Sequence, residues 1–284
     1  MPDISWLGPA IDVRPLFARQ HRGLISMLDG LSPQQWAQPT ACPGWDVKDV
    51  AAHVLADYVG RLARSRDGCR PPGPGDGESL PAFLDRLNDE WVRAARRISP
   101  RLLIEQLSVT GNQVAAYWQA TEPDALGEAV SWADPGPAPA WLDAAREFSE
   151  YWAHQQQIWQ ACGHAGLSGP EFLGPVIDTF MRALPYTLRN VSGPGGTAVQ
   201  MVVTGPGGGA WTCARGQDRW RMQPSSHLAP AARVALDSDT AWRLCTRGIT
   251  PAQATGRARI EGTRDLAAAA LQIVSIIWSP PVPG

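Results

Sequence analysis

The sequence REFSEYWAHQQQIWQACG, residues 146–163, decides how the rest of the chain is interpreted. Its apolar and aromatic residues recur at helical spacing, and Gly163 is a typical helix terminator. Glu150 precedes His154 by four residues, so both side chains lie on one face of the predicted helix, one turn apart. A carboxylate and an imidazole at that spacing can bind one metal ion together. They can equally form an ordinary pair on a helix surface, because such pairs are common.

A metal site needs a third ligand, and His53 is the best candidate. It lies in PGWDVKDVAAHVLAD, residues 43–57, where Asp46 is a suitable N-cap for a helix over 47–65. Two imidazoles and a carboxylate suit Zn²⁺, and the same set accepts Fe²⁺, Ni²⁺ or Mn²⁺. The alternative is that His53 is a hydrogen-bonded core histidine. Asp57, one turn after His53, is interpreted as an outer partner of the site or a surface charge rather than a ligand.

Hydrophobic periodicity predicts an all-helical first half and a mixed second half. Besides the helix over 47–65, we expect helices over 12–31, 80–98, 101–119 and 140–162. Beyond residues 168–170 we expect a helix over 171–189, strands within 197–237, a helix over 238–247, a strand in ATGRARIEG (254–262) and a final helix from 263 or 265 to 278. The predicted fold is therefore a four-helix bundle, domain 1–166, followed by a smaller α+β domain with an antiparallel sheet, 167–284.

Composition narrows the class of protein. The 284 residues carry a formal net charge of −2, which gives no argument for binding nucleic acid or an anionic membrane. No stretch reaches the roughly 18 apolar residues of a membrane span, and the N-terminus lacks the pattern of a signal peptide. The 5 cysteines are scattered without a C-x-x-C pair. We therefore expect reduced thiols in a cytoplasmic protein.

Several motifs resemble those of the mycothiol-dependent maleylpyruvate isomerase family in the DinB-like superfamily. PGWDVKDVAAHV is similar to the family stretch P-G-W-[TDS]-V-x-[DE]-[VL]-x-x-H-[LV], which delivers its first metal histidine and matches His53. EYWAHQQQIWQACG is similar to the family's later E-x-x-x-H helix and matches Glu150 and His154. LDSDTAWRLCTRG, TGRARIEG and GTRDLAAAAL resemble its C-terminal domain, which is similar to sterol-carrier-type α+β folds. The resemblance covers most of the chain.

The resemblance implies an enzyme with a divalent metal, most simply Zn²⁺, at His53, Glu150 and His154, and with mycothiol as thiol cofactor or cosubstrate. Arg257, on the matching TGR motif, would then hold a carboxylate of the substrate or thiol with paired hydrogen bonds. The alternative is a surface arginine. Family members often carry H-x-x-D after the second histidine, whereas this chain has Gln155, Gln156 and Gln157. That departure bears on the substrate more than on the metal.

Three functions remain open from the sequence. The first is cis–trans isomerisation through thiol addition to an activated double bond, as in maleylpyruvate to fumarylpyruvate. The second is mycothiol S-transfer, or a specialised-metabolism reaction in the same pocket. The third is a non-catalytic ligand-binding or regulatory module. The expected partners are a small-molecule substrate and a low-molecular-weight thiol, in a monomer or homodimer.

Overall fold

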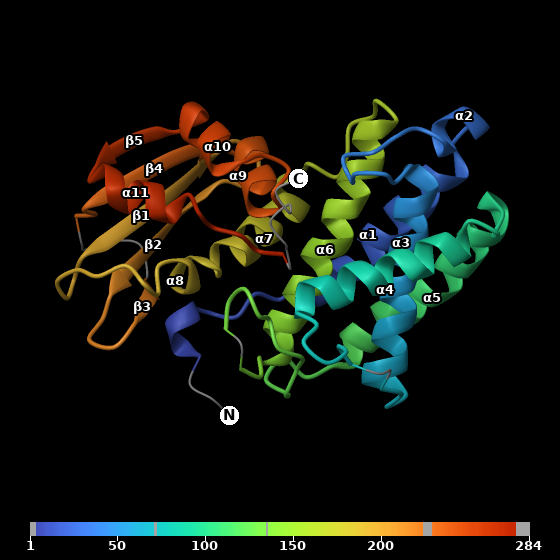
Figure 1. Ribbon diagram of the computed structural model, residues 1–284, viewed down its shortest axis with the longest axis horizontal. Coiled ribbons are helices and arrows are strands. Elements are labelled where there is room, and N and C mark those ends of the chain that lie inside the picture. The colour runs from blue at the N-terminus through green and yellow to red at the C-terminus, as the bar shows by residue number, and fades with distance from the viewer. Residues whose placement is uncertain (1–3, 71–72, 135, 224–228, 277–284) are drawn as a thin grey trace. The chain divides into compact units, whose positions relative to one another are not determined.

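The computed structural model describes residues 4–70, 73–134, 136–223 and 229–276 (Figure 1). Packing divides the chain into two compact units. The helical unit comprises Val13–Thr121 and Glu150–Leu167, and the sheet unit comprises the described residues of Met1–Asp12, Glu122–Ser149 and Ser168–Trp278. The chain leaves the helical unit after Leu167, next to the predicted domain boundary at 166/167. The chain also passes between them at 12/13, 121/122 and 149/150, and two sequence domains divided at 166/167 stay a prediction.

The helical unit confirms the predicted all-helical first half. It contains α1 (Phe17–Asp29), α2 (Pro33–Trp36), α3 (Val47–Arg61), α4 (Leu80–Ala95), α5 (Pro100–Ala120) and, from Glu150 onward, the second part of α6 (Ala140–Ala161). The predicted first helix begins later than expected, because residues Arg14–Leu16 form a 3-10 turn. Helix α3 continues as one π-helical turn over Leu62–Arg66.

Helix α3 begins where the sequence predicted. The Asp46 carboxylate accepts a hydrogen bond from the Asp49 backbone N–H at 2.9 Å, and the Asp49 carboxylate accepts from the Asp46 N–H at 3.5 Å. This reciprocal capping box satisfies two of the backbone donors that every helix start leaves unpaired. It fixes the phase of α3, and therefore the face on which His53 lies seven residues later.

Buried aromatic rings hold α1, α3, α5 and α6 together. The Phe17 ring stacks on Trp118 with centroids 5.8 Å apart, and Tyr58 meets Tyr151 edge to face at 4.8 Å. Such pairs add about 0.5–1.5 kcal/mol beyond the area that they bury. His21 packs against Tyr58, and Gly111 lets α5 approach closely, since a Cβ there would meet the His21 ring at 2.2 Å. The same contacts set the distance between α3 and α6.

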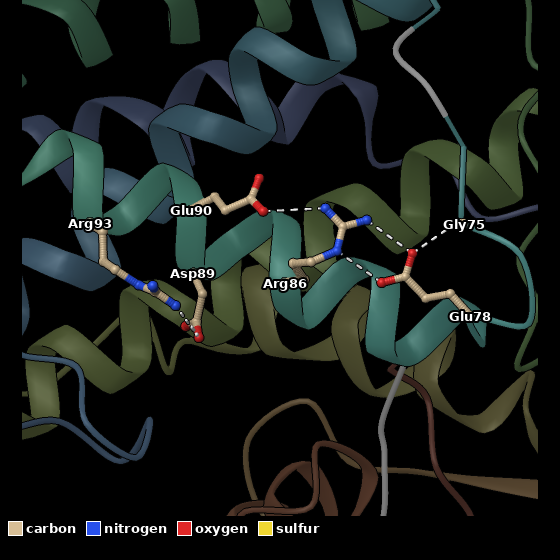
Figure 2. Close-up of polar contacts among 6 residues, drawn as sticks. All are labelled: Gly75, Glu78, Arg86, Asp89, Glu90 and Arg93. Carbon is tan, nitrogen blue, oxygen red and sulfur yellow. Dashed lines mark hydrogen bonds and ion pairs between the residues drawn. The ribbon is translucent and has the colours of Figure 1, made fainter.

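Helix α4 attaches to α3 and carries an exposed ion-pair network (Figure 2). The Trp91 indole N–H donates to the carbonyl of Ala52 at 2.9 Å, and Arg96 forms a two-pronged ion pair with the buried Asp49. On the outer side, Arg86 donates to both oxygens of Glu78 at 2.9 Å, and the Gly75 N–H donates to the same carboxylate. These bonds close the chain segment before α4 onto the helix.

The sheet unit contains a five-stranded sheet in the order β3-β2-β1-β4-β5 (Figure 1). Its strands are β1 (Ala198–Thr204), β2 (Gly209–Arg215), β3 (Trp220–Gln223), β4 (Ala232–Asp237) and β5 (Arg259–Gly262). Three neighbouring pairs are antiparallel, as predicted, but β4 lies parallel to β1. The sheet is thus mostly antiparallel, and helices α9 (Ser238–Cys245) and α11 (Arg264–Ala270) pack on its central strands β1 and β4.

The predicted strand at 254–262 is wrong in its first half. Residues Pro251–Arg257 form helix α10, and only Arg259–Gly262 pair with β4. The helix starts at a capping box in which Thr250 accepts from the Gln253 N–H at 3.2 Å and the Gln253 amide oxygen accepts from the Thr250 N–H at 2.9 Å. Proline follows the cap directly, which is the usual order at a helix start. Arg257 therefore ends a helix rather than standing on a strand.

Two further predicted helices are shorter than expected. The helix over 171–189 is divided into α7 (Pro170–Met181) and α8 (Leu184–Thr187), and the last helix ends at Ala270, while the predicted end at Trp278 lies outside the described residues. None of the helices in the described ranges is both long and apolar enough to cross a bilayer. All five cysteines, each within those ranges, are free thiols.

Candidate metal centre

Helices α3 and α6 bring His53 and His154 face to face within the helical unit. Their ring centroids are 4.6 Å apart and the rings are nearly perpendicular, at 85°. Together with Asp57, they form a group in which one ligand atom from each residue lies within 4.8 Å of the other two. Although about a hundred residues separate His53 from His154 in the sequence, the structure brings the two rings together, as predicted.

Each histidine has a carboxylate one helical turn away. Asp57 Oδ2 lies 3.5 Å from His53 Nε2, and Glu150 Oε1 lies 3.2 Å from His154 Nε2. The predicted ligand Glu150 thus contacts His154, while the compact group includes Asp57, which the sequence placed outside the ligand set. Two imidazoles and two carboxylates are therefore available, and Glu150 as the carboxylate ligand stays a prediction.

The His53 ring is enclosed and neutral. The residue is 5% exposed, and the Trp45 ring lies against it with centroids 5.2 Å apart. Burial, with a smaller contribution from the charge of His154, lowers the pKa of His53 to about 3. Its Nδ1 is buried and has no hydrogen-bond partner among the described residues. A buried imidazole held neutral offers the lone pair that metal coordination requires.

The His154 ring lies between two oxygen acceptors. Its Nδ1 is 2.8 Å from Gln157 Oε1, on the side opposite Glu150. Burial opposes protonation of this ring, but hydrogen bonds with Cys42 and Glu150 prevail and raise its pKa well above 6.5. Without a cation, His154 is therefore the protonated member of the pair and His53 the neutral one.

A tight turn covers this end of the two helices. The Thr40 hydroxyl donates to the Trp45 carbonyl at 2.9 Å and accepts from the Cys42 N–H at 3.1 Å. Gly44 has a φ of +78°, a left-handed conformation that glycine adopts without strain. The turn directs the Cys42 thiol to Gln157 Oε1 at 3.1 Å and places the Trp45 ring on His53.

The residues present fit a divalent cation. Neutral imidazole, carboxylate and a buried nitrogen lacking a partner are the donor types that Zn²⁺ and related ions select. The Gln157 amide oxygen at His154 Nδ1 matches the outer hydrogen bond that usually orients a metal-binding imidazole. Side chains of His53, His154, Glu150 and Asp57 would hold such an ion. Asp57 and Glu150 are partly exposed, at 25% and 34%, so both carboxylates reach solvent.

Comparison with known proteins places this centre inside a recognised domain. Residues 17–158 match the mycothiol maleylpyruvate isomerase N-terminal domain, which spans all four residues of the centre. The chain belongs to the mycothiol-dependent maleylpyruvate isomerase family. Among solved structures, the crystal structure of a mycothiol-dependent maleylpyruvate isomerase aligns with a TM-score of 0.46 at 12% identity, over 81% of this chain and 86% of that one. A mutant of that enzyme aligns over the same shares with a TM-score of 0.44. No curated protein matches the chain significantly.

Of the predicted site residues of this isomerase-family chain, Arg257 alone lies outside the helical unit. It is exposed at the C-terminal end of α10, in the sheet unit. Its predicted grip on a carboxylate stays a prediction.

Sequence reasoning missed two groups that contact His154. The sequence predicts Cys42 only as one of five reduced thiols, and Gln157 only as part of a departure from the family pattern. The spacing of His154 and Gln157, three residues apart on a helix, was a usable signal because such residues share a face. No spacing rule could place Cys42, which lies 115 residues from Gln157.

Proposed function

We propose that the protein is a metal- and mycothiol-dependent enzyme that adds the thiol to an activated double bond of a small carboxylate. Rotation about the resulting single bond and elimination of the thiol would complete a cis–trans isomerisation, as in maleylpyruvate to fumarylpyruvate. The observation that carries the proposal is the convergence of His53, Asp57 and His154 within the family's N-terminal domain. The expected location of such an enzyme is the cytoplasm.

The chain's own residues have separate tasks in this proposal. His53, Glu150 and His154 hold the ion, with Zn²⁺ the expected metal, and Asp57, whose Oδ2 lies 3.5 Å from His53 Nε2, supports His53 without binding the ion. The bound ion supplies Lewis acidity that lowers the pKa of a thiol. Trp45 packs against His53, and burial lowers the pKa of that ring to about 3, which keeps it neutral near pH 7. Arg257 is the proposed anchor for a substrate carboxylate.

The decisive experiment combines metal analysis with an assay for thiol dependence. The full-length protein is expected to purify with about one divalent ion per chain and to isomerise a cis-configured α,β-unsaturated oxo acid only when mycothiol is added. His53→Gln is expected to lower both metal content and turnover. Accumulation of a stable thioether would assign S-transfer instead. A protein that binds no metal and shows no thiol-dependent reaction would contradict the proposal in favour of a ligand-binding module.

A further inference from the structure

Gln157 occupies an unusual position beside His154. Its amide oxygen lies 2.8 Å from His154 Nδ1 and 3.1 Å from the Cys42 sulfur. An imidazole N–H and a thiol S–H are both donors, and an amide oxygen has two lone pairs with which to accept them. One acceptor thus satisfies two donors that come from helix α6 and from the turn before α3.

The hydrogen bond at Nδ1 determines which nitrogen of His154 is available to a cation. A proton held at Nδ1 leaves Nε2, which points to Glu150 at 3.2 Å, as the nitrogen that can bind a metal. An amide has no titrating group near neutral pH, so its oxygen accepts this proton over the whole physiological range. The contact therefore fixes the rotation of the ring and, once Nε2 has given up its proton to a bound cation, the tautomer as well.

The Cys42 contact fixes the amide itself. A glutamine side chain can rotate its terminal group by half a turn, which would present NH₂ to His154 in place of oxygen. With the thiol donating to the same oxygen, that rotation would break two hydrogen bonds at once. Cys42 is in turn held by its backbone N–H, which donates to Thr40 Oγ1 at 3.1 Å. A chain of contacts thus runs from the turn to the histidine.

We propose that Gln157 is the positioning residue that holds the Nδ1 proton of His154, and that Cys42 orients the Gln157 amide for that task. The inference rests on the proposed metal centre for its functional meaning. The contact itself, however, belongs to the metal-free protein and can be tested there. Neither residue touches the reacting atoms in this scheme.

The test uses the full chain with Gln157→Met, which keeps the length of the side chain and removes the acceptor. Gln157→Glu restores an acceptor oxygen at the same place. Gln160→Met, on the exposed side of the same helix, is the matched control. Cys42→Ala and Cys42→Ser separate loss of the thiol donor from its replacement by a hydroxyl donor.

Two readouts are measured on each variant. Proton–nitrogen NMR of the histidine rings reports the proton on His154 Nδ1 in the metal-free protein, and competition with a chelator gives the affinity for Co²⁺. Gln157→Met is expected to abolish the hydrogen-bonded Nδ1 signal and to weaken Co²⁺ binding about 10- to 100-fold, the usual effect of losing an outer partner. Gln157→Glu and Gln160→Met are expected to keep the signal and to bind Co²⁺ within a few-fold of the unchanged protein. Cys42→Ala is expected to fall between them, and Cys42→Ser close to the unchanged protein.

An unchanged Nδ1 signal in Gln157→Met would overturn the inference, whatever the protein does with metal. A protein that keeps the Gln157-dependent signal and binds no Co²⁺ would overturn the proposed metal centre while supporting the contact. If Gln157→Met does not fold, Cys42→Ala decides: a weakened Nδ1 signal there supports the chain of contacts, and a signal equal to that of the unchanged protein contradicts it.

Discussion

Two parts of the helical unit use the same spacing of charged residues and differ in burial. On α4, Arg86 pairs with Glu90 at 3.3 Å and Asp89 with Arg93 at 3.4 Å, each pair four residues apart, and about half or more of every side chain is exposed (Figure 2). On α3 and α6, His53–Asp57 and Glu150–His154 have the same spacing and similar distances, 3.5 and 3.2 Å. There the histidine side chains are only 6% and 11% exposed.

Helical spacing brings two side chains together as a pair, and burial determines the protonation states of that pair. Solvent screens the α4 pairs, so their charges cost little and contribute little. At the α3–α6 contact, two pairs converge, and the histidine pKa values move in opposite directions. A pair with unequal protonation is a common property of functional sites.

The largest effect is expected from removal of one histidine. His154→Ala deletes a proposed ligand and is expected to lower the affinity for Zn²⁺ roughly 100-fold or more, beyond the effect of losing an outer partner. Arg93→Ala breaks an exposed pair of the same spacing and should leave Zn²⁺ affinity unchanged. Chelator competition measures both. Equal Zn²⁺ affinity of the two variants would contradict the proposal that His154 is a metal ligand.

The second prediction separates the two carboxylates beside the histidines. Glu150→Gln and Asp57→Asn each remove one negative charge with little change of shape. With Glu150 as the ligand and Asp57 as the partner of His53, Glu150→Gln is expected to weaken Zn²⁺ binding about tenfold more than Asp57→Asn. The reverse order, measured by the same titration, would make Asp57 the ligand and would agree with the compact group of three.

The third prediction concerns pH. Because the pKa of His53 is about 3 in the folded protein and near 6.5 when unfolded, the unfolded chain binds more protons between these values. The stability associated with neutral His53 is therefore complete above about pH 6.5 and is lost as pH falls toward 3. In metal-free protein, His53→Gln should reduce this loss by a few kcal/mol, at about 1.4 kcal/mol per pKa unit. Chemical denaturation at pH 7 and pH 4 measures it, and identical pH dependence of variant and unchanged protein would contradict the assigned burial.

The smallest effect is expected at the exposed network on α4. Hydrogen bonds from Arg86 and from the Gly75 N–H lower the pKa of Glu78 to about 2. This carboxylate stabilises the fold above about pH 4.5 and ceases to do so as pH falls through 2. Arg86→Ala should return the Glu78 pKa, followed by NMR of the carboxyl carbon, most of the way to 4.5. Zn²⁺ affinity and the midpoint of urea unfolding at pH 7 should hardly change, and a large change in either would mean that the network supports the centre.

Much of the centre was predictable because local rules were sufficient for it. The Asp46 capping box determined where α3 begins, and thus the face carrying His53. Helical spacing placed Glu150 on His154. The same rules apply to Thr250, Pro251 and Gln253, whose capping box starts helix α10 and excludes a strand over residues 254–257.

The strand pairing and the place of Asp57 could not be predicted from local sequence patterns. The parallel pairing of β4 with β1 joins strands that β2 and β3 separate in the sequence, so no local pattern predicts it. Inclusion of Asp57 in the compact group depends on the rotation of α3 against α6, which the Tyr58–Tyr151 contact helps to set.

The sequence by itself determined the helices, their caps and the two histidines with a carboxylate one turn from each, because these depend on neighbours within a few residues. The tertiary structure alone decided that Cys42 and Gln157 meet at His154, and that one imidazole is held neutral while the other is protonated. The physical reason is that desolvation and hydrogen bonding depend on every group within a few ångströms. Those groups come from segments more than a hundred residues apart.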